Sequence, residues 1–323
     1  MLLVNTDTRL IVFIPCHNRK DTTQESIKHI YNVVNKKWEL TVHIIADGCT
    51  DGTVDMIKKQ HRKVEIHELN GKQYWGGCLN YITNFITNGN SICNDDIILI
   101  ANDDAYLSEK SLDMGVNYLI NSKNSALIPI LADASAESFS RNVQHQKILD
   151  INKDQIDVNW GNIYDAKLDK HINRRKPGCV NLGVTASILI KKSELIKAQR
   201  IPVGIPHYYS DFWMTYSLSL HGVAMTTNFE YYAIRKKELT RKSYGEKTKI
   251  KYWEQCCNPQ SPDYLPAGIL FTKHFSRGRG KRLKLMKQYI KFTLLYIVFS
   301  KKYANKASMQ TTPVKLMVDI LNK

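Results

Sequence analysis

The chain has 323 residues, a formal net charge of +16 and seven cysteines. Its apolar fraction of 43% is sufficient for a folded core. The sequence contains no run of 18 apolar residues, so we predict no membrane-spanning helix. The scattered cysteines contain no C-x-x-C pair, which argues against a disulfide framework or a zinc site and favours the cytoplasm. The N-terminus lacks a basic n-region and leads directly into Pro15-Cys16-His17-Asn18, so we interpret it as a first strand rather than a signal peptide.

Strands and helices alternate along the first hundred residues. Each predicted strand is a short apolar run, and the predicted helices carry apolar residues spaced by three and four. The strands are predicted at 10–14, 40–46, 64–69 and 97–101. The intervening helices are predicted near the capping-box signature Thr22-x-x-Glu25, from Val54 and around Leu79. This alternation predicts an α/β fold with a mostly parallel sheet flanked by helices.

The second half of the chain has a weaker pattern. Further strands are predicted at 126–131 and 184–190, a short helix at 193–199, and a helix through Met214 that ends at His221-Gly222. We expect three parts: a nucleotide-binding half, an acceptor-binding half and a helical basic tail. Their expected bounds are 1–125, 126–255 and 256–323.

Polar turns follow the predicted strands of the first half. Asp47 ends the second strand, the loop 70–75 follows the third, and Asp103-Asp104 end the fourth. Because right-handed crossovers bring these turns to one rim of the sheet, we expect them to lie close together. Two adjacent carboxylates there are suited to hold a divalent cation and a phosphate-bearing ligand. The alternative is that one of the aspartates caps a helix that begins near Ser108.

Several motifs occur in the order of one known family. I-P-x-H-N-R at 14–19, A-D-G-C-T-D-G-T at 46–53, Gly76-Gly77-x-x-Asn80 and Asn102-Asp103-Asp104 together resemble the nucleotide-sugar half of family-2 glycosyltransferases with the GT-A fold. G-C-V-N-L-G at 178–183 and P-H-Y-x-x-D-F at 206–212 resemble the acceptor half of bacterial, rhamnosyltransferase-like members that build envelope polysaccharides. The resemblance covers about residues 9–235.

The resemblance implies the donor-binding residues. Asp47 would accept a hydrogen bond from the N3–H of the base, Asp103 would face the ribose, and Asp104 would bind Mn²⁺ or Mg²⁺ that bridges the diphosphate. Tyr74 or Trp75 would pack on or near the base. The expected nucleotide-binding set is Pro15, His17, Arg19, Asp47, Tyr74, Trp75, Gly77, Asn102 and Asp103. The turn at 75–77 could approach the diphosphate because glycine has no side chain, or the glycines could only open a helix.

The resemblance also places a catalytic base at Asp211, where inverting members of the family keep theirs. The chemistry agrees, since an acceptor hydroxyl needs a positioned base and a diphosphate leaving group needs a cation. The neighbouring acidic residue of the family is Ser210 here, so the assignment rests on Asp211 alone. His207 and Tyr208 could shape the acceptor site or form a packed aromatic wall. His274 and His207 are the candidates for a third metal ligand.

The C-terminal tail is strongly basic. Residues 273–302 contain ten Lys or Arg and no Asp or Glu, and apolar residues recur at three and four from Leu283 to Ile297. This pattern is typical of an amphipathic helix that lies on an anionic membrane surface. The alternative is that the apolar stripe packs on the catalytic domain or on another subunit, which would give a homo-oligomer. We expect a cytoplasmic protein that is peripheral on the inner face of the cell membrane.

The expected function is therefore inverting, metal-dependent transfer of a sugar from a UDP-, dTDP- or GDP-linked donor to a hydroxyl of a cell-envelope polysaccharide or lipid-linked glycan. A sugar nucleotidyltransferase is an alternative, but it requires a Gly-rich basic loop that residues 15–19 do not supply. A nucleic-acid-binding protein is a second alternative based on the basic tail. That reading does not explain the acidic rim, so we expect no nucleic-acid partner.

Overall fold

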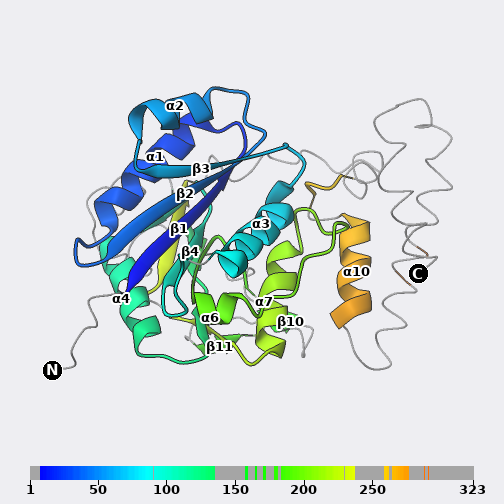
Figure 1. Ribbon diagram of the computed structural model, residues 1–323. Coiled ribbons are helices and arrows are strands. Elements are labelled where there is room, and N and C mark those ends of the chain that lie inside the picture. The colour runs from blue at the N-terminus through cyan, green and yellow to red at the C-terminus, as the bar shows by residue number, and fades with distance from the viewer. Residues whose placement is uncertain are drawn as a thin grey trace, which may run out of the picture.

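The computed structural model describes residues 8–89, 91–134, 157–158, 164–165, 170–171, 178–180, 183–228, 230–236, 258–261, 264–275, 287 and 290. A central sheet with helices on both faces forms the core of this part (Figure 1). The strands of the sheet are β1 (Arg9–Cys16), β2 (Glu39–Asp47), β3 (Val64–Leu69), β4 (Ile97–Ala101), β6 (Ser125–Leu127), β11 (Gly178–Val180), β12 (Ser187–Lys191) and β13 (Ala224–Thr227). Their order is β11-β13-β6-β12-β4-β1-β2-β3.

The half of the sheet built by the first hundred residues is entirely parallel. β1 lies between β2 and β4, and β2 pairs with the edge strand β3. β12 then runs antiparallel between β4 and β6, and β13 returns parallel to β6. The prediction of an α/β fold with a mostly parallel sheet is confirmed. The sheet continues through β6, which contains the predicted boundary at 125/126, so the division into halves stays a prediction.

Both faces of the sheet are buried because β1 alternates between two apolar surfaces. The helices are α1 (Lys20–Val33), α2 (Thr53–Gln60), α3 (Tyr74–Asn88), α4 (Glu109–Ile120), α6 (Lys192–Leu195), α7 (Ser210–Leu220) and α10 (Leu265–Phe275). Leu10, Val12 and Ile14 face a core formed with α1, α2 and α4, whereas Ile11 and Phe13 face a core formed with α3, α7 and α10. Each fully buried side chain of this kind contributes roughly 1.5–3 kcal/mol to folding.

A smaller sheet begins directly after the paired aspartates. It has the order β5-β14-β7-β8, and β9 pairs separately with β10. The loop 102–104 between β4 and β5 is held by the hydrogen bond from the Asn102 N–H to the Ala186 carbonyl oxygen, 2.9 Å. The strands are β5 (Ala105–Leu107), β7 (Ile130–Ala134), β8 (Asp157–Val158), β9 (Tyr164–Asp165), β10 (Lys170–His171) and β14 (Tyr232–Lys236).

The helix after the aspartates is capped by a different residue. Ser108 accepts a hydrogen bond from the Ser111 N–H at 3.1 Å and is the N-cap of α4. The reading of Asp103 or Asp104 as a helix cap is therefore wrong. The carboxylates remain available for another role.

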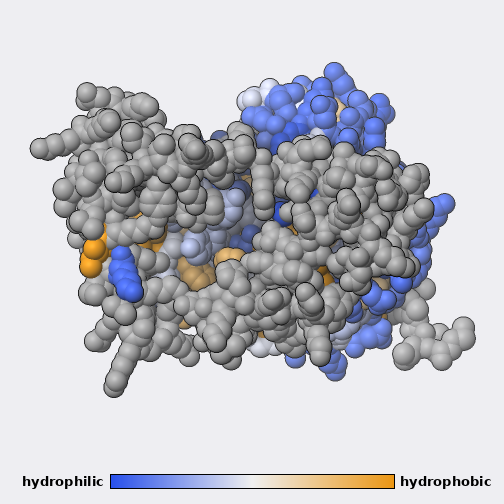
Figure 2. All heavy atoms as spheres, turned by 180° about the vertical axis from the view of Figure 1, so that it is seen from behind, coloured by the Kyte–Doolittle hydropathy of each residue, from blue (hydrophilic) through white to orange (hydrophobic). Residues whose placement is uncertain are grey.

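The surface around α1 and α2 is hydrophilic, as the view from behind shows at its upper right (Figure 2). Among the helices that the structure describes, none is long and apolar enough to cross a bilayer. The predicted tail helix at 283–297 lies outside the described residues, apart from the single positions 287 and 290.

Candidate active site

A cavity of about 320 Å³ lies at the carboxyl ends of β1, β2 and β4. This is the rim at which the polar turns were expected to meet, and open α/β sheets bind their ligands there. The structure brings nine of the predicted residues into the lining: Pro15, His17, Arg19, Asp47, Tyr74, Trp75, Asn102, Asp103 and His207. The remaining lining residues are Cys16, Gly71, Cys78 and Gln260.

Asp47 organises the loop between β3 and α3. Its Oδ1 accepts the Gly71 N–H at 2.8 Å, and its Oδ2 accepts the Gln73 and Tyr74 N–H groups, each at 3.0 Å. Tyr74 has a left-handed backbone, with φ 53°, which costs free energy for a residue with a side chain. The buried carboxylate therefore holds Tyr74 in this conformation at the cavity wall. The predicted contact of Asp47 with a base stays a prediction.

Arg19 pairs with both aspartates that follow β4. Its Nη1 donates to Asp103 Oδ1 at 2.7 Å and its Nη2 donates to Asp104 Oδ2 at 3.2 Å. Both carboxylates are buried. Burial raises the pKa of Asp103 to about 7, Arg19 opposes this shift, and the charge of Asp104 adds to it. Two carboxylates that share one guanidinium in a buried position form an acidic pair that a further cation would stabilise.

Two buried oxygens of this loop have no hydrogen-bond partner among the described residues. They are Oδ1 of Asn102 and Oδ1 of Asp104. An unsatisfied buried acceptor costs about 1–3 kcal/mol. Hard divalent cations such as Mg²⁺ and Mn²⁺ prefer oxygen ligands of this kind. The oxygens present therefore fit a divalent cation at Asp104, although Asp104 itself is not among the residues that line the cavity.

Asp211 lies in the first turn of α7 and is tied to the cavity through Trp75. The Trp75 indole N–H donates to Asp211 Oδ1 at 2.7 Å, and the backbone N–H and the hydroxyl of Thr185 donate to the same oxygen. Burial raises the pKa of Asp211, and these hydrogen bonds and His207 partly oppose the rise. One oxygen is thus fixed by three donors, and the structure records no hydrogen bond for Oδ2 within its described residues. A carboxylate held this way is suited to accept a proton.

His207 lies beside this group and lines the cavity. Its Nδ1 is buried and has no hydrogen-bond partner in the described part of the chain. Burial lowers its pKa, and Asp211 opposes the shift. Tyr208 packs edge-on against the His207 ring, with the centroids 5.0 Å apart, and is partly exposed outside the cavity lining.

The two glycines after Trp75 have different surroundings. A Cβ on Gly76 would lie 2.5 Å from the Ile205 carbonyl oxygen, and the Gly76 N–H donates to the Pro206 carbonyl oxygen at 2.8 Å. Gly76 therefore lets the first turn of α3 approach the segment that leads to α7. Gly77, which was predicted to contact the nucleotide, does not line this cavity; together with Gly76 it lines a separate cavity of about 250 Å³.

His274, the predicted metal ligand, is in α10 and does not line the cavity at the carboxyl ends of β1, β2 and β4. Its ring stacks on Trp213 with the centroids 4.5 Å apart, and its Nε2 is 3.2 Å from the Gln199 side-chain oxygen. These contacts join α10 to α7, and a metal-binding role for His274 stays a prediction. Thr185, which contacts Asp211, was not predicted, because no local motif marks it.

The chain was then compared with known proteins. The sequence profile described as Glycosyl transferase family 2 matches residues 11–176, just over half of the chain. No curated protein matches it. Similar solved structures include GalNAc-T7 with UDP, GalNAc and Mn²⁺, at 8% identity and a TM-score of 0.53 over 71% of this chain. The chain spans only 44% of the length of that protein.

Two further structures are similar over nearly the whole chain. One is the mannosyltransferase PcManGT from Pyrobaculum calidifontis in complex with GDP-Man and Mn²⁺, at 12% identity and a TM-score of 0.52, covering 98% of this chain and 80% of that one. The other is S. aureus TarS 1-349, at 11% identity and a TM-score of 0.50, covering 95% and 77%. At these identities the likeness establishes the fold alone. The chain belongs to glycosyl transferase family 2 and has the GT-A fold.

Proposed function

We propose that the protein transfers a sugar, with inversion, from a nucleoside diphosphate donor to a hydroxyl group of a glycan acceptor. The observation that carries this proposal is the position of three carboxylates around one cavity. Asp103 lines it, Asp104 is buried next to Asp103 in the chain, pairs with the lining residue Arg19 and has one unpaired oxygen, and Asp211 accepts a hydrogen bond from the lining residue Trp75. The acidic residues proposed to act on the leaving group, Asp103 and Asp104, follow β4, whereas the one proposed to act on the acceptor, Asp211, lies in α7.

The donor occupies the cavity with its nucleoside toward the loops at 15–19 and 71–75. Tyr74 and Trp75 offer aromatic faces to the base, and Asp103 faces the ribose. Asp104 would hold Mn²⁺ or Mg²⁺, and this ion would neutralise the charge that develops on the diphosphate leaving group. The complexes of PcManGT with GDP-Man and Mn²⁺ and of GalNAc-T7 with UDP and Mn²⁺ support a donor of this class.

Arg19 has to share the two aspartates with this donor. Its guanidinium pairs with Asp103 and Asp104 in the described structure. When the diphosphate binds, a guanidinium at this place can pair with phosphate oxygens in the same bidentate manner. Arg19 thereby keeps the acidic pair compensated before the donor arrives and helps to bind the donor afterwards.

Asp211 acts as the base. Its Oδ2 takes the proton of the acceptor hydroxyl while the acceptor oxygen bonds to the anomeric carbon and the bond from that carbon to the phosphate oxygen breaks. The nucleoside diphosphate leaves with the bonding pair. The three donors on Oδ1 fix the carboxylate, and its raised pKa makes it a stronger base than an exposed aspartate.

The acceptor is a cell-envelope polysaccharide or a lipid-linked glycan. His207 lines the cavity, Tyr208 packs against the His207 ring outside the lining, and both contact the acceptor. The basic tail from 273 to 302 binds the protein peripherally to the inner face of the membrane, where a lipid-linked acceptor is held. A homo-oligomer through the same tail is the competing use of its apolar stripe.

The test is donor turnover by the purified full chain. A panel of UDP-, GDP- and dTDP-sugars with Mn²⁺ and a lipid-linked acceptor should release a nucleoside diphosphate with one of the donors. Asp104→Asn and Asp211→Asn should each lower kcat/KM by at least about 100-fold, the range typical of positioned acids and bases. Gln199→Ala, which removes the partner of His274, is the control and should retain activity. If either aspartate variant retains normal turnover, the assignment of that residue is wrong.

A further inference from the structure

We propose that His43, Glu65 and His67 form a second metal site, for a transition ion of the Zn²⁺ class. The site lies on β2 and the edge strand β3, and none of its residues lines the donor cavity. It does not depend on the proposed transfer reaction. Its imidazole-rich donor set also differs from the oxygen donors of the site at Asp104, because imidazole favours Zn²⁺, Cu²⁺ and Ni²⁺ over Mg²⁺ and Mn²⁺.

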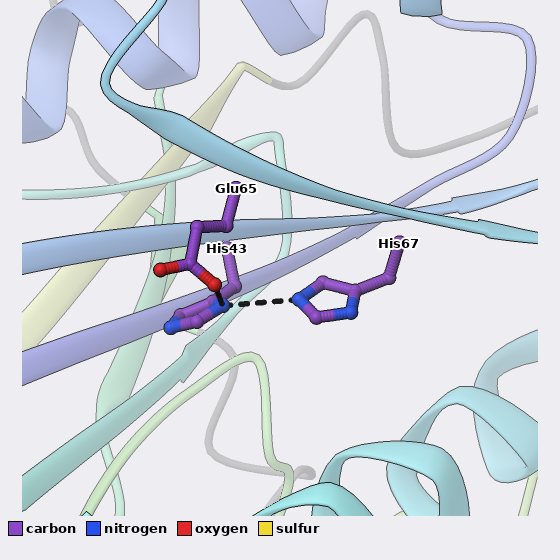
Figure 3. A group of neighbouring side chains, drawn as sticks. All are labelled: His43, Glu65 and His67. Atoms are coloured by element: carbon purple, nitrogen blue, oxygen red, sulfur yellow. Dashed lines mark hydrogen bonds and ion pairs between the residues drawn. The ribbon is translucent and has the colours of Figure 1, made fainter. Parts of the chain in front are cut away.

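The register of the parallel strands brings the three side chains together. His43 is paired with Glu65, and Ile45 is paired with His67. Since residues two apart on a strand point to the same face, the two histidines and the glutamate share one face of the sheet. Figure 3 shows Glu65 and His67 both directed at one ring nitrogen of His43.

The distances are close to those of a coordination sphere. His43 Nδ1 lies 3.0 Å from His67 Nε2 and 3.3 Å from Glu65 Oε2, and all three ligand atoms lie within 4.8 Å of one another. A tetrahedral ion with bonds of about 2.0–2.1 Å requires ligand atoms roughly 3.3 Å apart. Small rotations of the exposed Glu65 and the half-buried His67 therefore suffice to admit an ion. Two histidines and one glutamate leave the fourth position to water.

The surroundings hold both rings in place and keep them neutral. His43 is buried and stacks on Phe13 with the centroids 4.6 Å apart, and His67 Nδ1 lies 3.0 Å from the Tyr81 hydroxyl. A hydrogen bond to the distal nitrogen of a ligating histidine orients the ring and raises its basicity. Burial and the neighbouring His67 lower the pKa of His43 to about 4, and burial also lowers the pKa of His67. Neutral imidazoles with directed lone pairs are the form that binds a metal.

An ion at this site would join β2 to the edge strand of the sheet. His43 lies four residues before Asp47 on β2, roughly 13 Å away along the strand. β3 leads through residues 70–73 to Tyr74, which Asp47 holds at the donor cavity. Metal binding would therefore stabilise β2 and β3, which support one wall of the donor cavity. The ion itself would lie outside that cavity.

The test uses Co²⁺ as a spectroscopic probe on the full chain after treatment with a chelator. It is made in the Asp104→Asn background, which removes the proposed Mn²⁺ ligand. We expect one Co²⁺ per chain with the intense visible absorption of a tetrahedral complex, and Zn²⁺ should displace it. His67→Gln and Glu65→Gln should each weaken binding by more than about 100-fold. Tyr81→Phe should weaken it by about 10–100-fold, the range for outer partners of ligating histidines.

Glu68→Gln is the matched control, because Glu68 is exposed on the opposite face of β3 and pairs with Lys58 at 2.7 Å. It should bind Co²⁺ as the parent does. Glu65 is also an exposed residue, so its variant is expected to fold, and circular dichroism will verify this. The proposal is overturned if the parent shows no tetrahedral Co²⁺ spectrum, or if Glu65→Gln and His67→Gln bind Co²⁺ as tightly as Glu68→Gln.

Discussion

Replacement of Trp75 by phenylalanine tests how the proposed base is tuned. Trp75 donates its indole N–H to Asp211 Oδ1 at 2.7 Å, and this bond lowers a pKa that burial raises. Phenylalanine keeps an aromatic ring at the cavity wall but has no donor. A hydrogen bond to a charged group contributes about 1.5–3 kcal/mol, and one pKa unit corresponds to about 1.36 kcal/mol. The pKa of Asp211 should therefore rise further, and the acidic limb of the kcat/KM profile should move up by about one to two pH units.

The sign follows from the role of the group. Protonated Asp211 cannot accept the acceptor proton, so a higher pKa removes activity at the acidic end of the profile and leaves the alkaline end unchanged. Thr185→Val removes a second donor to the same oxygen and should shift the limb in the same direction. Tyr74→Phe is the control, because Tyr74 lines the cavity without contacting Asp211. An acidic limb that stays in place in both Trp75→Phe and Thr185→Val would refute the assignment of Asp211 as the base.

Three further predictions concern stability. Asp47→Asn should lower the free energy of unfolding by about 2–4 kcal/mol in urea titrations, because its carboxylate accepts three backbone N–H groups; an unchanged midpoint would contradict this. Gly76→Ala should cost about 1–3 kcal/mol, because its Cβ would meet the backbone carbonyl oxygen of Ile205 at 2.5 Å; an unchanged Tm would argue against the close approach. Because the pKa of Asp103 is raised to about 7, its stabilising contribution is present at acidic pH and is lost as the pH rises through 7. Without divalent ions, Asp103→Asn should thus gain stability relative to the parent as the pH rises from about 4 to about 7 and should keep that gain above pH 7; a parallel pair of curves would contradict this.

The half of the sheet formed by β1 to β4 was predictable because each of its strands is a short apolar run bounded by polar turns. The strands predicted at 64–69 and 97–101 have the bounds of β3 and β4. The convergence of the turns at one rim follows from parallel pairing, which the alternation of strands and helices implies. The cavity and nine of its lining residues could therefore be expected from the sequence.

Contacts between distant segments could not be expected in the same way. The capping-box signature Thr22-x-x-Glu25 predicts a helix start that the structure does not use. α1 begins at Lys20, whose N–H donates to the Asp51 side chain at 2.9 Å, across 31 residues of sequence. Thr185 contacts Asp211 for a similar reason. It lies in the loop just before β12, and the pairing of β12 with β4 places this loop beside Asp211. Local patterns carry no signal for such partners.

The sequence also does not show which polar side chains already accept hydrogen bonds from neighbouring backbone groups. Asp47 was expected to bind a base, yet its two oxygens accept N–H groups from a loop that folds over it. Gly76 and Gly77 cannot be distinguished from the sequence, but only Gly76 has a backbone carbonyl oxygen 2.5 Å from the position of an added Cβ. Such differences depend on packing at the level of single atoms.

The most direct measurement of the central claim is nucleotide binding with and without Mn²⁺. Calorimetry and thermal unfolding of the full chain should be compared for UDP, GDP and dTDP, in the parent and in Asp104→Asn. The account predicts that at least one nucleotide binds and raises Tm only when Mn²⁺ is present, and that Asp104→Asn abolishes the Mn²⁺-dependent part. No Mn²⁺-dependent binding of any of the three nucleotides, or an unchanged response in Asp104→Asn, would contradict it.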